Sequence, residues 1–429
     1  MDPASLKAQL DAAVKANGPR QIEWLRQLAS FASTRGNTAP CQEWLAGEFA
    51  ARGWQVDRYS LADIDLSATR GYSPAVDVDY ANEMQVVAAV PPPARHGRSL
   101  ILQGHIDVVP PGPREDWAHD PFTPQIADGV MTGRGVYDMK AGVAEMVFAL
   151  DALHAIGLAP AADIFVETVS EEECTGNGAL STLVRGYRAD ACLIPEAVDG
   201  QLLRAQLGSI WFRLKLKGRA AHVLETERGD NAILRAYDYI AALQRLAAAH
   251  SDRAKSMPWF SHLPDAIKVS VGRIKGGDWI GMVPAWCEMD CRIGVLPGQD
   301  LAELRDTLVA TVNACARAHN VAPPEVEWIG FQADAYILEP GSAAEAALSA
   351  AHQAVAGTPL TAFTQPATSD VRHYAAFGGM PALCYGGKGS GLHGPQERVD
   401  LASMLDTTTV LALFIADWCG VVPLSTATG

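Results

Sequence analysis

The order of apolar and polar residues divides the chain into three stretches. Between Met84 and Ile194, short apolar runs alternate with segments in which apolar residues recur every three or four positions. This alternation of strands and helices is typical of a mostly parallel sheet covered by helices. From Ser209 the pattern changes, because SIWFRLKLK alternates apolar and polar residues as a half-exposed strand does. After about Ala333 the first pattern returns. The sequence therefore predicts an α/β fold that carries a smaller inserted α+β unit.

The predicted elements follow from this spacing and from the Gly, Pro and Asn residues that interrupt it. Predicted helices span Pro3–Lys15, Gln21–Ala32, Cys41–Arg52, Ala141–Ile156, Ala179–Tyr187, Asn231–Ala248, Gln299–His319, Ser342–Val355, Ser369–Phe377 and Leu401–Trp418. Predicted strands span Trp54–Ser60, Met84–Val90, Ser99–His105, Asp163–Val169, Ala191–Ile194, Ser209–Lys217, Ile267–Ile274, Ala285–Val295 and Ala382–Tyr385. We predict one domain formed by residues 1–207 and 333–429, and a smaller inserted α+β domain formed by residues 208–332.

Composition and charge exclude several classes of partner. The chain has 429 residues, 48% hydrophobic content and a formal net charge of −15, which argues against nucleic acid or anionic membranes as partners. Its eight cysteines are scattered without a Cys-x-x-Cys motif, as expected of reduced thiols. The N-terminus is polar and lacks an apolar signal core, and no apolar run approaches the length of a membrane span. We therefore expect a cytoplasmic protein.

The first candidate for chemistry is the stretch Ile101–Asp107, which reads ILQGHID. A buried strand that ends in this way places the imidazole of His105 at the carboxyl edge of a sheet. The carboxylate of Asp107, two residues on, points to the same side. A histidine that binds a metal through one ring nitrogen usually donates a hydrogen bond from the N–H of the other nitrogen to a carboxylate of this kind. On its own the pattern is more often that of a structural histidine, so its meaning depends on ligands at other strand ends.

Further acidic residues and a second histidine do follow other predicted strand ends. They are Asp138, the run Glu171–Glu173, Glu196 and His393. In an α/β sheet the carboxyl ends of parallel strands face one edge, so we expect these side chains to converge. So many carboxylates in one place would repel one another unless cations neutralise them. The sequence therefore predicts two Zn²⁺ ions, about 3.5–4 Å apart and bridged by a carboxylate. Such ligands also accept Co²⁺ or Mn²⁺.

Five motifs in order give the chain a wider resemblance. They are GHIDVVP (104–110), GRGVYDMKAG (133–142), SEEECTGNGA (170–179), Pro195-Glu196 and HGPQE (393–397). With these motifs the chain resembles the M20 metallopeptidases, which include acetylornithine deacetylase, succinyl-diaminopimelate desuccinylase, aminoacylase-1 and glutamate carboxypeptidase. The resemblance extends from about Gln21 to Trp418.

The resemblance implies a role for each residue of the cluster. His105 and Glu196 match the ligands of one zinc, Asp138 the bridging ligand, Glu173 and His393 the ligands of the other zinc, and Asp107 the carboxylate that orients His105. Glu172 matches the general base, because the family places two acids directly before x-x-Gly-x-Gly. Glu171 then takes the preceding acidic position. This division agrees with the chemistry, which needs one carboxylate on the metal and a neighbour free to accept a proton.

The middle stretch resembles the dimerisation or lid domain of the same family. Its GRAAH motif (218–222) ends in His222. In the family the corresponding histidine reaches the active site of the partner subunit and donates a hydrogen bond to the developing oxyanion. We therefore expect a homodimer that forms through the inserted domain.

Two positions depart from the family pattern. Relatives often carry an Asn and an Arg in the lid that bind the substrate, and the corresponding positions here are Gly281 and Gly294. Arg292 lies on the same strand face as Gly294 and could partly substitute for the missing Arg. Arg372, in SDVRH, is a second candidate for binding a substrate carboxylate, although it could equally form a structural ion pair with Asp370. The departures put recognition of an amino acid in question.

These observations predict a two-zinc amidohydrolase that cleaves the amide bond of an N-acyl amino acid, with Glu172 moving the proton. The alternatives are a dipeptidase or carboxypeptidase that acts on a short peptide at the same site, and a non-catalytic binding module that keeps the fold. A serine hydrolase is not supported, because the chain has no Gly-x-Ser-x-Gly motif.

Overall fold

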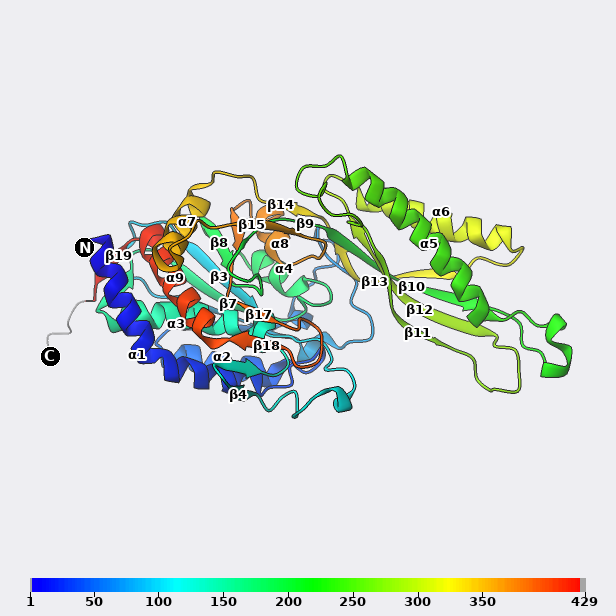
Figure 1. Cartoon of the computed structure of the whole chain (residues 1–429), viewed down its shortest axis with the longest axis horizontal. Coiled ribbons are helices and arrows are strands. Elements are labelled where there is room, and N and C mark those ends of the chain that lie inside the picture. Colours follow the sequence, from blue (N-terminus) through cyan, green and yellow to red (C-terminus); the bar gives the residue numbers. More distant parts are fainter. Residues whose placement is uncertain (1, 425–429) are drawn as a thin grey trace.

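The computed structural model describes residues 2–424, which form a large lobe and an elongated smaller lobe (Figure 1). The large lobe is built on a six-stranded sheet with the strand order β1-β2-β7-β3-β8-β16. Its strands are β1 (Gln55–Ser60), β2 (Met84–Val90), β7 (Ile164–Val169), β3 (Leu100–His105), β8 (Ala191–Ile194) and β16 (Ala382–Cys384). The last four run parallel, whereas β1 and β2 pair antiparallel at one edge. The predicted α/β fold is confirmed.

Helices cover this sheet and share one continuous apolar core with it. They are α1 (Pro3–Ala29), α2 (Ala39–Ala51), α3 (Ala141–Ala155), α4 (Asn177–Val184), α7 (Ala343–Ala356), α8 (Val371–Ala376) and α9 (Leu401–Cys419). The prediction of two helices before residue 32 was wrong, because α1 continues through Pro19. In Figure 1 this helix changes direction about half-way along, as expected where proline removes one backbone hydrogen bond.

Helix α9 is unusually apolar and is largely buried in the fold. By length and composition alone it could cross a membrane, which the sequence prediction had overlooked, yet 67% of its most apolar window is buried inside the fold. It packs against α1, α3 and α7. A buried core helix of this kind is weak evidence for a membrane span.

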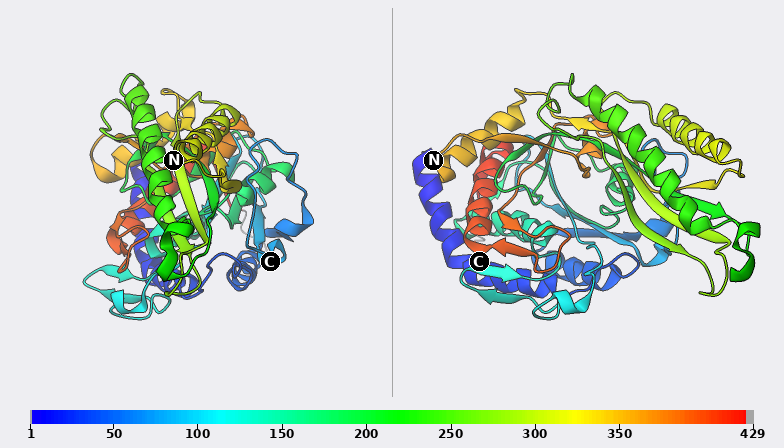
Figure 2. Two further views of the ribbon diagram at one scale, coloured as in Figure 1. Left: turned by 90° about the vertical axis from the view of Figure 1, so that its right-hand side faces the viewer. Right: turned by 45° about the vertical axis from the view of Figure 1, so that its right-hand side comes forward.

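The smaller lobe is a four-stranded antiparallel sheet in the order β11-β12-β10-β13. Its strands are β10 (Gly208–Lys217), β11 (Val269–Gly276), β12 (Trp286–Val295) and β13 (Glu325–Ala333). The strand β13 was not predicted. Two helices, α5 (Ala232–Ala254) and α6 (Leu301–Ala318), pack on one face of the sheet and form a separate apolar cluster with it (Figure 2). We call residues 208–332 the lid, and the domain boundaries themselves stay a prediction.

The opposite face of the lid sheet carries ion pairs and contacts the large lobe. Arg213 on β10 pairs with Asp290 on β12 at 2.6 Å and with Asp77 of the large lobe at 2.8 Å. The backbone N–H of Gly330 also donates to the carbonyl of Pro74. The segment around residues 73–77 therefore connects the two lobes.

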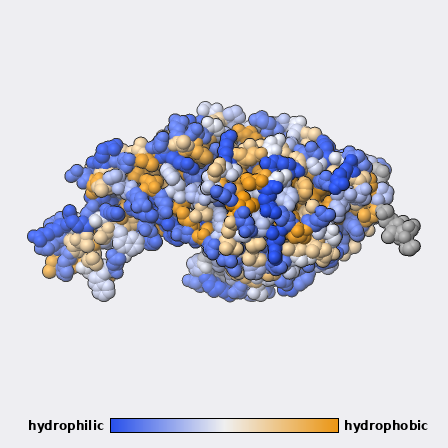
Figure 3. Space-filling model, turned by 180° about the vertical axis from the view of Figure 1, so that it is seen from behind, coloured by the Kyte–Doolittle hydropathy of each residue, from blue (hydrophilic) through white to orange (hydrophobic). Residues whose placement is uncertain are grey.

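Short strands complete the fold. They form three small sheets: β17 (Gly389–Ser390), β18 (Arg398–Asp400), β5 (Val130–Thr132) and β4 (Gln125–Ala127); β14 (Tyr336–Ile337), β9 (Leu202–Gln206) and β15 (Ala362–Gln365); and β19 (Val421–Pro423) with β6 (Leu158–Pro160). All eight cysteines are free thiols, as predicted. On the face shown in Figure 3, hydrophilic residues surround scattered small apolar patches.

Candidate metal centre

The carboxyl ends of the parallel strands bring the predicted ligands together. His105 is the last residue of β3, and the Glu171–Glu173 run begins two residues after β7. Glu196 follows β8 by two residues, and His393 lies in the turn between β17 and β18, in the Gly-rich segment after β16. Asp138 comes from the segment that enters α3. Each side chain therefore reaches the same edge of the sheet from a different loop.

The distances define two groups that share Asp138. Its Oδ1 lies 3.1 Å from Nε2 of His105, and its Oδ2 lies 3.2 Å from Nε2 of His393. The Oε2 of Glu173 lies 3.2 Å from the same nitrogen of His393. The Oε1 of Glu196 lies 3.7 Å from Nε2 of His105. A single carboxylate thus stands between a His105–Glu196 group and a His393–Glu173 group.

Asp107 organises two of these loops at once. Its backbone carbonyl is 2.8 Å from Nδ1 of His105, which leaves Nε2 directed at the cluster. Its buried carboxylate accepts the backbone N–H groups of Glu172 at 3.3 Å and Glu173 at 3.1 Å. The residue therefore fixes the ring of His105 and also the turn that presents both glutamates.

The three consecutive glutamates have different environments. Glu171 has a positive φ of 69° and is 1% exposed, and its carboxylate accepts hydrogen bonds from Arg35, Tyr80 and Thr175. Glu173 contacts His393. The carboxylate of Glu172 lies 3.9 Å from Nε2 of His105 and forms no hydrogen bond within residues 2–424. Only Glu172 combines a place in the cluster with oxygens free to accept a proton.

Glu397 and Arg134 support Asp138, and sequence reasoning did not assign them a role. The Oε1 of Glu397 accepts the backbone N–H groups of Tyr137 at 2.9 Å and Asp138 at 3.0 Å. Its Oε2 accepts the N–H of Gly135 at 2.9 Å and Nη1 of Arg134 at 2.7 Å. The same guanidinium donates to the carbonyl of His393. The sequence signal that could have identified this support was Glu397, which is the last residue of the HGPQE motif.

The electrostatics of the cluster show an excess of negative charge. Burial raises the pKa of Glu196 to about 8 and that of Glu172 well above its usual range. Hydrogen bonds with the carboxylates of Asp138 and Glu173 raise the pKa of His393 to about 11. The metal-free site therefore retains protons that bound cations would replace.

The donor set fits divalent metal ions. His105, Asp138 and Glu173 offer ligand atoms that all lie within 4.8 Å of one another, and so do His105, Glu172 and Glu196. Imidazole and carboxylate are ligands of zinc and related ions. Several carboxylates this close repel one another, and bound divalent cations would neutralise that repulsion.

A pocket of about 290 Å³ opens beside the cluster. Its wall includes Asp138, Glu172, Glu173, Glu196 and His393. The remaining lining residues are small, apolar or uncharged: Ala197, Val198, Gln365, Ala367, Thr368, Ser369 and Leu392. The space suits a small organic substrate beside the metal ligands.

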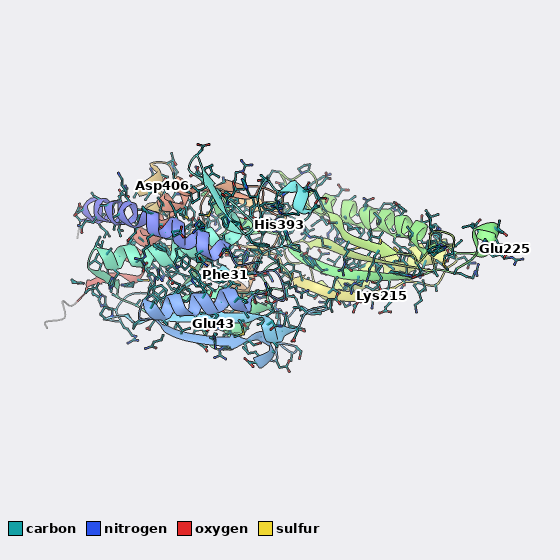
Figure 4. All side chains as sticks on the ribbon, turned by 90° about the horizontal axis from the view of Figure 1, so that it is seen from below. Phe31, Glu43, Lys215, Glu225, His393 and Asp406 are labelled. Atoms are coloured by element: carbon teal, nitrogen blue, oxygen red, sulfur yellow. The ribbon has the colours of Figure 1, made fainter. Side chains whose placement is uncertain are left out.

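Three predicted residues lie outside both the cluster and this pocket. His222 is exposed and begins the short helix Val223–Arg228 at the far end of the lid; in Figure 4 the nearby Glu225 is far from His393. Arg292 is half-buried on β12, and burial alone lowers its pKa. Arg372 is buried and donates to the carbonyls of Ser369 at 2.7 Å and Thr175 at 3.1 Å. Within one chain, none of the three reaches the pocket.

Comparisons with known proteins agree with this geometry. The model of peptidase family M20/M25/M40 matches residues 101–417. The chain is 28% identical to N-formyl-4-amino-5-aminomethyl-2-methylpyrimidine deformylase of Halalkalibacterium halodurans over 410 residues, covering 89% of this chain and 90% of the relative. It is 32% identical to succinyl-diaminopimelate desuccinylase of Stenotrophomonas maltophilia over 299 residues, covering 67% and 71%.

Solved structures confirm the fold. The dipeptidase Dug1p of Saccharomyces cerevisiae superposes with a TM-score of 0.80 at 15% identity, covering 97% of this chain and 99% of that chain. The family match spans most of the sheet and the whole candidate metal centre. The chain is therefore a hydrolase that belongs to peptidase family M20/M25/M40.

Proposed function

We propose that the chain hydrolyses the amide bond of a small N-acylated compound by means of two divalent metal ions. His105, Asp138 and Glu196 would hold one ion, and Asp138, Glu173 and His393 the other. Zn²⁺ is the expected metal, with Co²⁺ or Mn²⁺ as acceptable substitutes. When bound, the pair supplies a water of lowered pKa and polarises the amide carbonyl.

The residues of the chain perform the proton transfers. Glu172 is placed to accept the proton of the attacking water, because its carboxylate lines the pocket and has no hydrogen-bond partner within residues 2–424. The protonated Glu172 then donates to the leaving amine nitrogen, which departs as the neutral amine. Asp107 keeps both glutamates and His105 in register during these steps.

The observation that carries this proposal is the sharing of Asp138. One carboxylate within 3.2 Å of two histidines, each beside a second acid, is the arrangement that bridges a metal pair. Structural ion pairs do not need such a concentration of acids around an open pocket.

The names of the relatives support deacylation. One relative is a deformylase and another a desuccinylase, and both names describe removal of an acyl group from an amine. N-acyl amino acids are the substrates that the sequence predicts. The runner-up is a dipeptidase, which the similarity to Dug1p favours at the level of the fold.

The lid supports a homodimer. His222 is too remote to act on the pocket of its own chain, so a role at an oxyanion requires delivery to a partner subunit. A monomeric form should therefore have little activity.

The test of the proposed function combines metal analysis with turnover. Purified protein should contain two equivalents of divalent metal and hydrolyse members of a panel of N-formyl, N-acetyl and N-succinyl amines. Glu172→Ala and Glu172→Gln should keep both metal ions and lose about 10²–10⁴-fold in kcat. Near wild-type turnover in either variant would show that another residue moves the proton.

A further inference from the structure

The part of the pocket that receives the organic groups of the substrate has no positively charged side chain. Apart from the predicted metal ligands and Glu172, every lining residue is apolar or a neutral polar residue. No lysine or arginine lines the pocket in the described part of the chain. A carboxylate is normally recognised by arginine, whose guanidinium binds both oxygens. That partner is missing here.

The metal ions do not provide a surplus of positive charge. Four carboxylates face the pocket, from Asp138, Glu172, Glu173 and Glu196. Two divalent ions, as in the proposed function, would balance these four negative charges and leave no net attraction for a further anion. A substrate carboxylate buried there without a partner would lose its hydration at considerable cost.

The two candidate arginines are occupied or distant. Arg372 is buried against the ring of Phe331, with its guanidinium 5.1 Å from the ring centre, and its nitrogens donate to backbone carbonyls. Arg292 lies on β12 of the lid sheet, between Trp211 on β10 and Ser270 on β11, and does not line the pocket. Neither can reach a ligand in the pocket of this conformation.

The two arginines at the tip of the lid already have partners, because Nε of Arg219 donates to the backbone carbonyl of Arg228 and the guanidinium of Arg228 pairs with Glu225 at 3.0 Å. His222 forms a β-bridge with Met282, next to Trp279 and Ile280, whose side chains are 72% and 97% exposed. A tip that brings His222 to a partner's pocket therefore brings large apolar side chains with it.

From these observations we infer that the natural substrate is an N-acylated amine without a carboxylate near the scissile amide, rather than an N-acyl amino acid. Its organic group is uncharged and packs against the walls formed by Val198, Leu392 and the segment 365–369. This inference rests on the proposed function. It also agrees with the presence of Gly281 and Gly294 where relatives carry the Asn and Arg that bind the substrate.

The test compares substrates that differ in one group. N-acetylphenethylamine, N-acetyl-L-phenylalaninamide and N-acetyl-L-phenylalanine share an acyl group and a phenyl ring, but only the last carries a carboxylate. The N-formyl series provides a second set. We expect kcat/KM for the amine and the carboxamide to exceed that for the acid by at least about tenfold. The carboxamide controls for size, so the difference reports charge.

Binding measurements keep the inference separate from the proposed function. Calorimetry with the metal-loaded His222→Ala variant, which is expected to be inactive and keeps all four carboxylates, should show tighter binding of the carboxamide than of the acid, even if no compound in the panel is turned over. Failure of turnover alone would then count against the proposed function. Equal or tighter binding of the acid would overturn the inference. If a preference for the acid disappeared in Arg292→Met, the substrate carboxylate would be assigned to Arg292 of the lid, and this result would also overturn the inference.

A gain-of-charge variant tests the physical reason. Gln365 lines the pocket, so Gln365→Arg should raise the ratio of kcat/KM for the acid to that for the carboxamide. Gln365→Met is the matched control, because its side chain is of similar length without charge. An unchanged ratio in Gln365→Arg would show that pocket charge does not govern selectivity and would overturn the inference.

Discussion

Replacement of Glu397 by glutamine should weaken metal binding without any change in a metal ligand. The carboxylate of Glu397 is 1% exposed and accepts four hydrogen bonds, three from backbone N–H groups between Gly135 and Asp138 and one from Arg134. Glutamine has one oxygen in place of two. In Glu397→Gln either the Arg134 and Gly135 donors, or the Tyr137 and Asp138 donors, would face an amide NH₂ group.

The magnitude follows from the donors left without an acceptor. A buried donor that loses its acceptor costs about 1–3 kcal/mol, and removal of one member of a buried ion pair costs about 3–5 kcal/mol. The segment that carries Asp138 would then relax, and part of this cost would reappear each time a metal ion draws Asp138 back into position. We expect affinity for at least one metal ion to fall by about 10–100-fold.

The assay is competition between the metal-free protein and a chelator of known affinity, followed by calorimetry. The control is Glu325→Gln, which removes an exposed ion pair with Lys215 on the lid and should bind two metal ions as the wild type does. If Glu397→Gln binds two equivalents with unchanged affinity, the segment holds Asp138 by other means and the reasoning is refuted.

Three other predictions concern the same fold. Dialysis against a chelator should abolish hydrolysis, and added Zn²⁺ should restore it; activity that survives with less than one equivalent of metal would refute a metal mechanism. Mixing inactive Glu172→Gln and His222→Ala proteins should restore up to about a quarter of wild-type activity, because mixed dimers contain one complete site; no recovery after subunit exchange would argue against delivery of His222 by a partner. Burial raises the pKa of Glu167 to about 7 despite hydrogen bonds from Tyr374 and Thr182. The pKa of this carboxyl in the unfolded chain is 4.5, so the folded state binds the proton more tightly. The protonated Glu167 therefore favours folding fully below pH 4.5, and this contribution to stability is lost as the pH rises through 7. Between pH 4.5 and 8 the wild type should lose about 3 kcal/mol relative to Glu167→Gln, measured by urea unfolding; parallel profiles would contradict this.

The convergence of the proposed metal ligands could be predicted because several of them follow short buried strands. His105 ends one apolar run and Glu196 follows another by two residues; both runs read as strands of a parallel sheet, whose ends meet at one edge. The resemblance then separated the roles of Glu172 and Glu173, which spacing alone leaves open. The geometry now distinguishes them by contact with His393.

Other features depend on contacts that no local pattern contains. Glu397 meets Asp138 across 259 positions of sequence, so its function was hidden in a motif that had been noticed only for its histidine. Strand β13 was missed because its neighbour β10 lies about a hundred residues earlier and its own sequence is broken by Gly330. The break predicted at Pro19 was wrong because α1 is held on both sides of it by burial against the core.

The surroundings of Glu171 have a consequence for how the protein can be divided. The family match begins at residue 101, but the cation that neutralises Glu171 belongs to Arg35, and a further hydrogen bond comes from Tyr80. A fragment of residues 101–417 would contain every proposed metal ligand and would still leave a buried carboxylate beside them without its counter-ion. It would also lack β1 and β2, so β7 would become an exposed sheet edge. The segment matched by the family model and the smallest autonomous folding unit therefore have different limits, and an active minimal protein has to start before Arg35.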